Sequence, residues 1–148
     1  MKLQTASEVI SFARELEDKS AKFYESLAEK FKDYRETFLS FVKENKKNKM
    51  LVQRAYNEVI SDALETGFSF EGLDKDTYLI ETNLSQDENL TSLINKALDM
   101  EEKIKRFYLN AAKKSESLLA DVPRVFEKIA RKRAERKEKL KLLFNPKL

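Results

Sequence analysis

The chain has 148 residues, contains neither cysteine nor histidine, and carries 29 basic against 26 acidic side chains, a formal net charge of +3. This length suits one domain with a sizeable core, and the missing residue types exclude disulfides, cysteine-ligated metal sites, thiol nucleophiles and imidazole ligands or bases. Only two glycines and two prolines interrupt a sequence in which 37% of residues are charged, a pattern typical of long amphipathic helices that predicts an all-α fold.

The first two predicted helices form a hairpin over residues 6–65. Thr5 to Glu8 has the form of a capping box, and apolar residues then recur near the helical period to about residue 32. Asp33 and Tyr34 supply a turn, and a second apolar stripe extends from Phe38 to about Leu64. Because the connection is so short, we expect the two helices to be antiparallel neighbours.

Residues 66–89 interrupt this pattern with Gly67, Gly72 and many polar side chains. We expect a long crossover with a helical turn near residues 75–80. Its apolar side chains indicate that it packs along the helices.

A second helix hairpin is predicted over residues 90–144. The third helix extends from Leu90 to about Ser117, and the fourth begins at the capping residue Asp121 and ends near Asn145 and Pro146. A crossover long enough to traverse the bundle would make the second and third helices parallel. This is the ferritin-like arrangement of a four-helix bundle, in a single domain of residues 1–148.

The two hairpins carry the same pattern of residues. Glu17 precedes the pair Phe23-Tyr24 by six and seven residues, and Glu101 precedes Phe107-Tyr108 by the same spacing. Two helical turns separate each Glu from its Tyr, so the two side chains share one helix face. A repeat of roughly 84 to 88 residues covers a whole helix pair, which indicates a bundle with two-fold pseudosymmetry.

This arrangement resembles the rubrerythrin-like branch of the ferritin-like superfamily, and the resemblance covers nearly the whole chain. In that family a Glu on the first helix of each pair and a Glu-x-x-His motif on each second helix hold two irons, which react with peroxide or dioxygen. The resemblance places the first-helix ligands at Glu17 and Glu101. It places the second-helix motifs on Asn45-Lys46-Lys47-Asn48 and on Arg133-Ala134-Glu135-Arg136.

Four of the six ligand positions carry residue types that do not suit iron. They are Asn45, Asn48, Arg133 and Arg136. A neutral amide oxygen is a poor donor to iron, and a guanidinium has no lone pair to give. We therefore interpret the six positions as remnants of a diiron site and expect neither bound metal nor catalytic residues. Any metal that did bind would use Glu17 and Glu101.

The six positions lie on the inward-leaning faces of their helices. A buried charge needs a partner, because an isolated one costs several kcal/mol or more. Two glutamates and two arginines balance in sign and number, so we expect Arg133 and Arg136 to neutralise Glu17 and Glu101.

These patterns leave an enzymatic and a non-enzymatic reading open. The leading hypothesis is a non-catalytic structural or regulatory module that keeps the bundle and has lost the diiron site. The alternative is a diiron oxidoreductase, peroxidase or iron-binding protein of rubrerythrin type with two iron ions, in which Glu44 or Glu135 replaces a lost ligand. Each of these residues lies one position from an inward-facing residue, about 100° around the helix.

A third reading is a basic surface that binds an acidic partner. The residues from Arg131 to Lys141 are mostly basic, and Lys43, Lys46, Lys47 and Lys49 lie on the second helix. The simpler interpretation is a solvated face with intrahelical pairs such as Glu135 with Lys139. No aromatic side chain interleaves the basic run, so nucleic acid is not the expected partner.

The sequence also gives expectations for location and assembly. Residues 1–4 lead directly into an amphipathic stretch, and no apolar run approaches the length of a membrane span, so we expect a cytoplasmic protein without a membrane partner. The resemblance implies a homodimer as one form of assembly.

Overall fold

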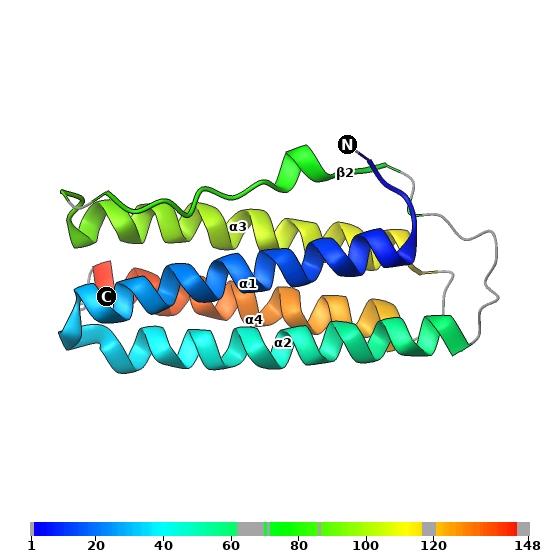
Figure 1. Cartoon of the computed structure of the whole chain (residues 1–148), viewed down its shortest axis with the longest axis horizontal. Coiled ribbons are helices and arrows are strands. Elements are labelled where there is room, and N and C mark those ends of the chain that lie inside the picture. Colours follow the sequence, from blue (N-terminus) through cyan, green and yellow to red (C-terminus); the bar gives the residue numbers. More distant parts are fainter. Residues whose placement is uncertain (1, 62–69, 71, 86, 117–120, 145–148) are drawn as a thin grey trace.

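The computed structural model describes residues 2–61, 70, 72–85, 87–116 and 121–144. Within these residues the chain forms four long helices and one pair of very short strands, which confirms the all-α prediction (Figure 1). The helices are α1 (Ala6–Lys30), α2 (Arg35–Ser61), α3 (Leu90–Lys114) and α4 (Asp121–Phe144).

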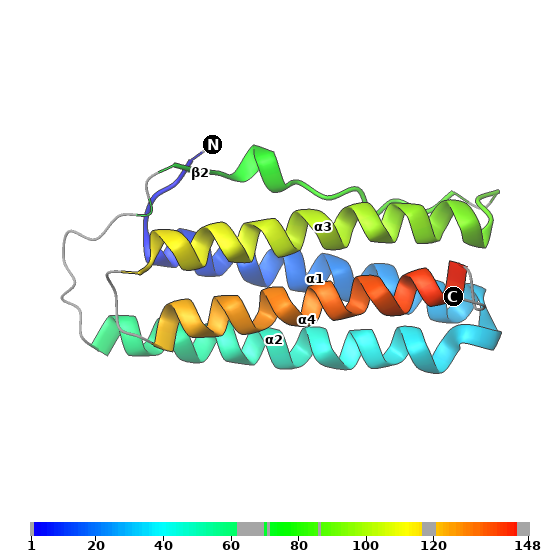
Figure 2. The same cartoon turned by 180° about the vertical axis from the view of Figure 1, so that it is seen from behind.

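The four helices lie side by side, as the two opposite views in Figures 1 and 2 show. Helix α1 packs along α2, α3 packs along α4, and α2 also contacts α4. Helices α1 and α4 run in one direction, and α2 and α3 run in the other (Figure 1). Side chains from all four helices therefore meet along the centre of the bundle.

The start of α1 follows its predicted capping signal. The Thr5 hydroxyl accepts a hydrogen bond from the Glu8 N–H, and the Glu8 carboxylate accepts one from the Thr5 N–H, so the capping box is confirmed. Helix α1 ends at Lys30, two residues before the predicted end, because the chain turns into the short 3-10 helix η1 (Lys32–Tyr34). The predicted ends of the other three helices lie outside the described residues.

The described part of the connection runs beside α3 and α1, on the side of the bundle away from α2 (Figures 1 and 2). Strand β2 (Leu73–Asp74) pairs antiparallel with β1 (Lys2–Leu3), a contact that the sequence did not predict. The 3-10 helix η2 (Lys75–Tyr78) lies within the helical turn expected near residues 75–80. Gly72 precedes β2 with a φ of +87°, a conformation that favours glycine.

Lysines on the helices hold this connection through its backbone. Lys30 donates to the carbonyl oxygens of Ser85 and Glu88, and Lys103 donates to that of Leu79. No helix in the described part of the chain has the length and apolar character needed to cross a bilayer.

Candidate functional site

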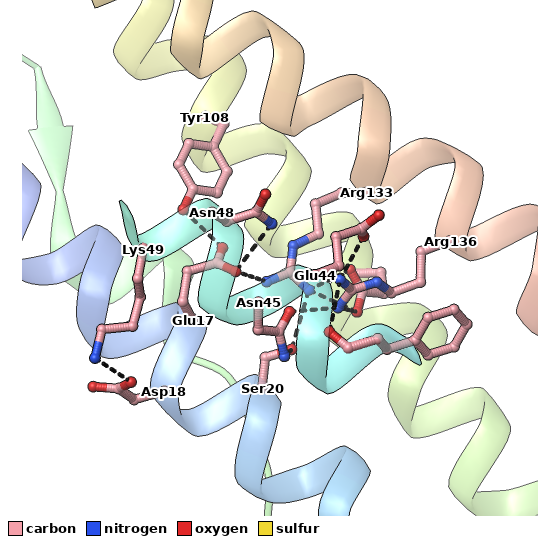
Figure 3. Close-up of polar contacts among 12 residues, drawn as sticks. Glu17, Asp18, Ser20, Glu44, Asn45, Asn48, Lys49, Tyr108, Arg133 and Arg136 are labelled. Atoms are coloured by element: carbon pink, nitrogen blue, oxygen red, sulfur yellow. Dashed lines mark hydrogen bonds and ion pairs between the residues drawn. The ribbon is translucent and has the colours of Figure 1, made fainter. Parts of the chain in front are cut away.

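The middle of the bundle is polar, although apolar and aromatic residues fill the core on both sides of it. All six positions singled out in the sequence are at most 1% exposed there, and helical periodicity brings them inward from all four helices. They are Glu17 on α1, Asn45 and Asn48 on α2, Glu101 on α3, and Arg133 and Arg136 on α4. We call these six residues, with Ser20, Tyr24, Tyr108 and the half-buried Glu44, the central cluster. Figure 3 labels all of them except Glu101 and Tyr24.

Arg133 joins the two buried glutamates. Its Nη2 lies 2.7 Å from Glu17 Oε1, and its Nη1 lies 2.8 and 2.9 Å from the two carboxylate oxygens of Glu101. The same Nη1 also donates to the Ser20 hydroxyl at 3.1 Å. One guanidinium thus lies between two carboxylates that belong to helices far apart in the sequence.

Arg136 lies closer to the edge of the cluster. Its Nη2 is 2.6 Å from Glu44 Oε1, and its Nη1 is 2.8 Å from Asn45 Oδ1 and 3.4 Å from Glu101 Oε2. The guanidinium carbon lies 4.9 Å from the centre of the Phe41 ring, within the range of a cation–π interaction. Arg136 therefore pairs mainly with Glu44, which the sequence offered only as a relocated metal ligand.

Two tyrosines donate further hydrogen bonds to the buried glutamates. The Tyr24 hydroxyl donates to Glu101 Oε2 at 2.5 Å, and the Tyr108 hydroxyl donates to Glu17 Oε2 at 2.8 Å. The sequence showed that each Tyr shares a face with the Glu of its own helix. In the folded chain, each Tyr bonds the Glu of the other helix pair.

The two asparagines link the cluster to α2. Asn48 Nδ2 donates to Glu17 Oε1 at 3.1 Å, and Asn45 Nδ2 donates to the Ser20 hydroxyl at 3.3 Å. Among the described residues, Asn48 Oδ1 and the Nε atoms of Arg133 and Arg136 have no hydrogen-bond partner.

The electrostatics of the cluster favour the ionised forms of Glu101 and Arg133. Burial raises the pKa of Glu101. The positive charges of Arg133 and Arg136 outweigh this effect, so the pKa of Glu101 lies below its ordinary value. Burial also opposes the charge on Arg133, but Glu101 and Glu17 raise its pKa well above the usual range. Burial is the largest cause that raises the pKa of Tyr24 and of Tyr108 well above 10. The negative charge of Glu101 acts in the same direction on Tyr24, and that of Glu17 does so on Tyr108. Both tyrosines therefore remain protonated donors.

The arrangement does not fit a pair of iron ions. Every carboxylate oxygen of Glu17 and Glu101 already accepts at least one hydrogen bond, and the Arg133 guanidinium lies between the two carboxylates. A metal ion there would have to displace these donors and would be repelled by two fixed positive charges. Within the described residues, no group of three or more Asp and Glu side chains could hold a metal ion.

A surface groove of about 280 Å³ between α1 and α2 reaches the cluster from outside. Glu17 and Asn45 contribute to its lining, and Lys49 pairs with Asp18 at 2.8 Å beside it (Figure 3). Glu17 and Asn45 already have hydrogen-bond partners within the cluster, so these two side chains offer little to a further polar ligand in the groove.

Comparisons with known proteins do not identify a relative: the sequence matches no family model, and no curated protein or solved structure matches it. A family assignment therefore depends on the repeated residues and on the geometry of the central cluster.

Proposed function

We propose that this protein is a non-catalytic structural or regulatory module, derived from the rubrerythrin-like branch of the ferritin-like superfamily, in which arginine has replaced iron as the counter-charge of the buried glutamates. The observation that carries the proposal is the position of Arg133, which donates to both Glu17 and Glu101. A guanidinium supplies positive charge and hydrogen bonds without a coordination site or a redox change.

Three features support the ancestry in this proposal. The two glutamates, the two Phe-Tyr pairs and the two altered motifs recur at equivalent places of the two helix pairs. The altered motif residues lie beside the glutamates in the folded chain. The directions of the four helices also match the bundle with one long crossover that ferritin-like folds use (Figure 1).

The diiron alternative receives no comparable support. Glu44, one of the two relocated ligands considered, forms an ion pair with Arg136 at 2.6 Å. Glu135, the other, is exposed to solvent on α4. An iron pair would thus have two buried carboxylates with their oxygens already engaged and no further inward ligand from α4.

Metal analysis tests the proposal directly. Protein purified without chelators, and protein incubated with Fe(II) under anaerobic conditions and then desalted, would be measured by elemental analysis. We expect well below one iron per chain in both samples. About two irons per chain, the stoichiometry of the family site, would contradict the proposal and restore the diiron alternative.

A further inference from the structure

The outer face of α2 and α4 carries many positive charges without an ion-pair partner in the described part of the chain. The basic residues that do pair use other faces: Arg133 and Arg136 point inward, Lys137 pairs with Glu102 of α3, and Lys49 pairs with Asp18 of α1. The Glu135–Lys139 pair expected from the sequence does not form among the described residues. Lys141 pairs instead with Glu138.

The unpaired cations form two rows. On α4, Arg124, Lys128 and Lys132 are spaced four residues apart, so they lie on one side of the helix at intervals of about 6 Å. On α2, Lys43, Lys47 and Arg54 follow steps of four and seven residues, which also keeps them on one side. Helices α2 and α4 contact each other, and Arg54 of the first helix and Arg124 and Lys128 of the second line the seam between them.

A groove of about 220 Å³ lies in this seam. Arg54, Arg124 and Lys128 are exposed at its edge, and the aliphatic side chains of Leu51 and Val125 line it. Asp121 is the one carboxylate in the described lining, beside three cations. The groove therefore combines an apolar floor with a positively charged rim.

On the opposite side of the bundle the connection itself is mainly acidic, although Lys30, Lys96 and Lys103 of the helices donate hydrogen bonds to it. The described part of the connection runs there, away from α2 (Figures 1 and 2), and carries acidic residues in excess of its single lysine. They are Asp74, Asp76, Glu81, Asp87 and Glu88. A negatively charged partner would therefore be steered toward the α2–α4 face and away from the connection.

We propose that the groove between α2 and α4 binds an acidic amphipathic helix of a partner protein. Carboxylates one helical turn apart on such a helix would match the spacing of about 6 Å between successive cations on α4. An apolar stripe between its acidic residues would cover Leu51 and Val125, the usual mode of helix binding in a groove. A nucleic acid fits less well, because the described lining is aliphatic and charged and offers no aromatic ring for base stacking.

This inference rests on the proposed function in one respect, since it names the kind of partner that a non-catalytic module would bind. The two proposals use different residues. Iron found in the bundle of a protein that still binds an acidic helix would overturn only the proposed function. Failure of helix binding in an iron-free protein would overturn only the docking surface.

The probe is a fluorescent synthetic peptide that folds as a helix with a leucine stripe flanked by glutamates at i, i+4 spacing. We expect the full chain to bind it with a Kd of about 50 μM or tighter near 50 mM salt, and at least about tenfold more weakly near 300 mM salt. A peptide with glutamine in place of every glutamate should bind at least about tenfold more weakly than the acidic one.

Charge reversal locates the surface. The triple variant Arg54→Glu, Arg124→Glu, Lys128→Glu should weaken binding of the acidic peptide by about tenfold or more. The control variant Lys22→Glu, Lys32→Glu, Lys113→Glu makes the same change in net charge at exposed lysines elsewhere, and should change the Kd by less than about threefold. Circular dichroism would verify that both variants are folded.

Each other outcome overturns the proposal. No binding of the acidic peptide at low salt, or equal losses in the two triple variants, would show that the groove is not a specific docking surface. Tighter binding of duplex or single-stranded DNA than of the peptide, abolished by the groove variant, would make the surface a nucleic-acid site. Self-association that the groove variant abolishes would make it an interface between two copies of this chain.

Discussion

The hydroxyl of Tyr24 donates a hydrogen bond to Glu101, the glutamate at the equivalent position of the other half of the chain. The reverse bond, from Tyr108 to Glu17, completes an exchange between the two halves. Each glutamate therefore has a donor from the opposite helix pair in addition to Arg133, and the cluster ties both halves together.

Removing the shared cation should be costly. Arg133→Met leaves two buried carboxylates without their main partner, so we expect the free energy of unfolding to fall by about 3 kcal/mol in chemical denaturation. Arg131→Met, at an exposed position of the same helix, is the control and should change it by less than about 0.5 kcal/mol. A loss of that small size in Arg133→Met would show that the guanidinium does not neutralise the glutamates.

Removing all four charges together should be tolerated better than removing one. The variant Glu17→Leu, Glu101→Leu, Arg133→Met, Arg136→Met removes every fully buried charge of the central cluster and leaves only the half-buried Glu44 without its arginine. Because well-packed apolar residues often replace buried ion pairs without loss, we expect it to unfold at a higher denaturant concentration than Arg133→Met alone. A quadruple variant less stable than the single one would show that the cluster contributes more than charge balance.

The crosswise bonds predict which pairs of residues are energetically coupled. Tyr24→Phe removes a donor to a buried carboxylate and should cost about 1 to 3 kcal/mol of stability. In a double-mutant cycle, Tyr24→Phe should couple with Glu101→Gln by about 1 kcal/mol and with Glu17→Gln by clearly less. Equal coupling to both glutamates would contradict the crosswise arrangement.

High pH should unfold the protein through the same tyrosines. The folded-state pKa values of Tyr24 and Tyr108 lie well above 10, so the unfolded chain releases these protons first as the pH rises. Their contribution to stability is complete below about pH 10 and falls above it. Tyrosinate absorbance should therefore show a late phase that coincides with the loss of helical circular dichroism. Tyr24→Phe and Tyr108→Phe should each reduce that phase, and an unchanged amplitude in both would contradict the assignment.

Low pH should act through Glu102, at the interface of α3 and α4. Its hydrogen bond with Lys137, followed by those with Lys105 and Arg106, lowers its pKa from 4.5 to about 2. A lowered pKa stabilises the fold above the unfolded-state value, and this contribution is lost as the pH falls from about 4.5 to about 2. Solvent screens the half-buried pair, so we expect a loss of about 1 kcal/mol. Denaturation curves should show a weaker dependence on pH in Glu102→Gln than in the exposed control Glu127→Gln.

The proposed ancestry predicts that residues 45–48 and 133–136 can be converted to the Glu-x-x-His pattern of rubrerythrin-like proteins. The variant Asn45→Glu, Asn48→His, Arg133→Glu, Arg136→His has a Glu-x-x-His motif on both second helices and removes both buried cations. We expect it to bind about two Co(II) ions per chain, with visible absorption bands that the parent chain lacks. A folded variant that binds no metal would show that these positions do not correspond to the ligands of a diiron site.

The sequence was sufficient to predict the four helices and the burial of charged residues. Helical periodicity indicates which face of a helix is covered. The six polar positions, Glu17 and Arg133 among them, interrupt otherwise apolar faces, so their burial could be inferred from the sequence. The need to pair buried charges then predicted that arginines and glutamates would meet.

The partners within the cluster were less predictable. A helical period fixes the direction of Tyr24 on its own helix but not which helix lies opposite, so the bond to Glu101 required the packed bundle. Glu44 lies beside the buried face, and only the long side chain of Arg136 brings it into contact. The strand pair β1–β2 has two residues on each side, too few for an alternating pattern to be visible in the sequence.

The unequal placement of the arginines determines how the halves of this protein can assemble. A bundle made from two copies of α1 and α2 would enclose two copies of Glu17 without an internal cation, and one made from two copies of α3 and α4 would enclose four guanidiniums with two copies of Glu101. Both assemblies would bury uncompensated charge, which the natural combination avoids. The two helix pairs are therefore not interchangeable. An exchange of helix pairs between two chains would keep the charges balanced only if each α1–α2 pair packed against an α3–α4 pair.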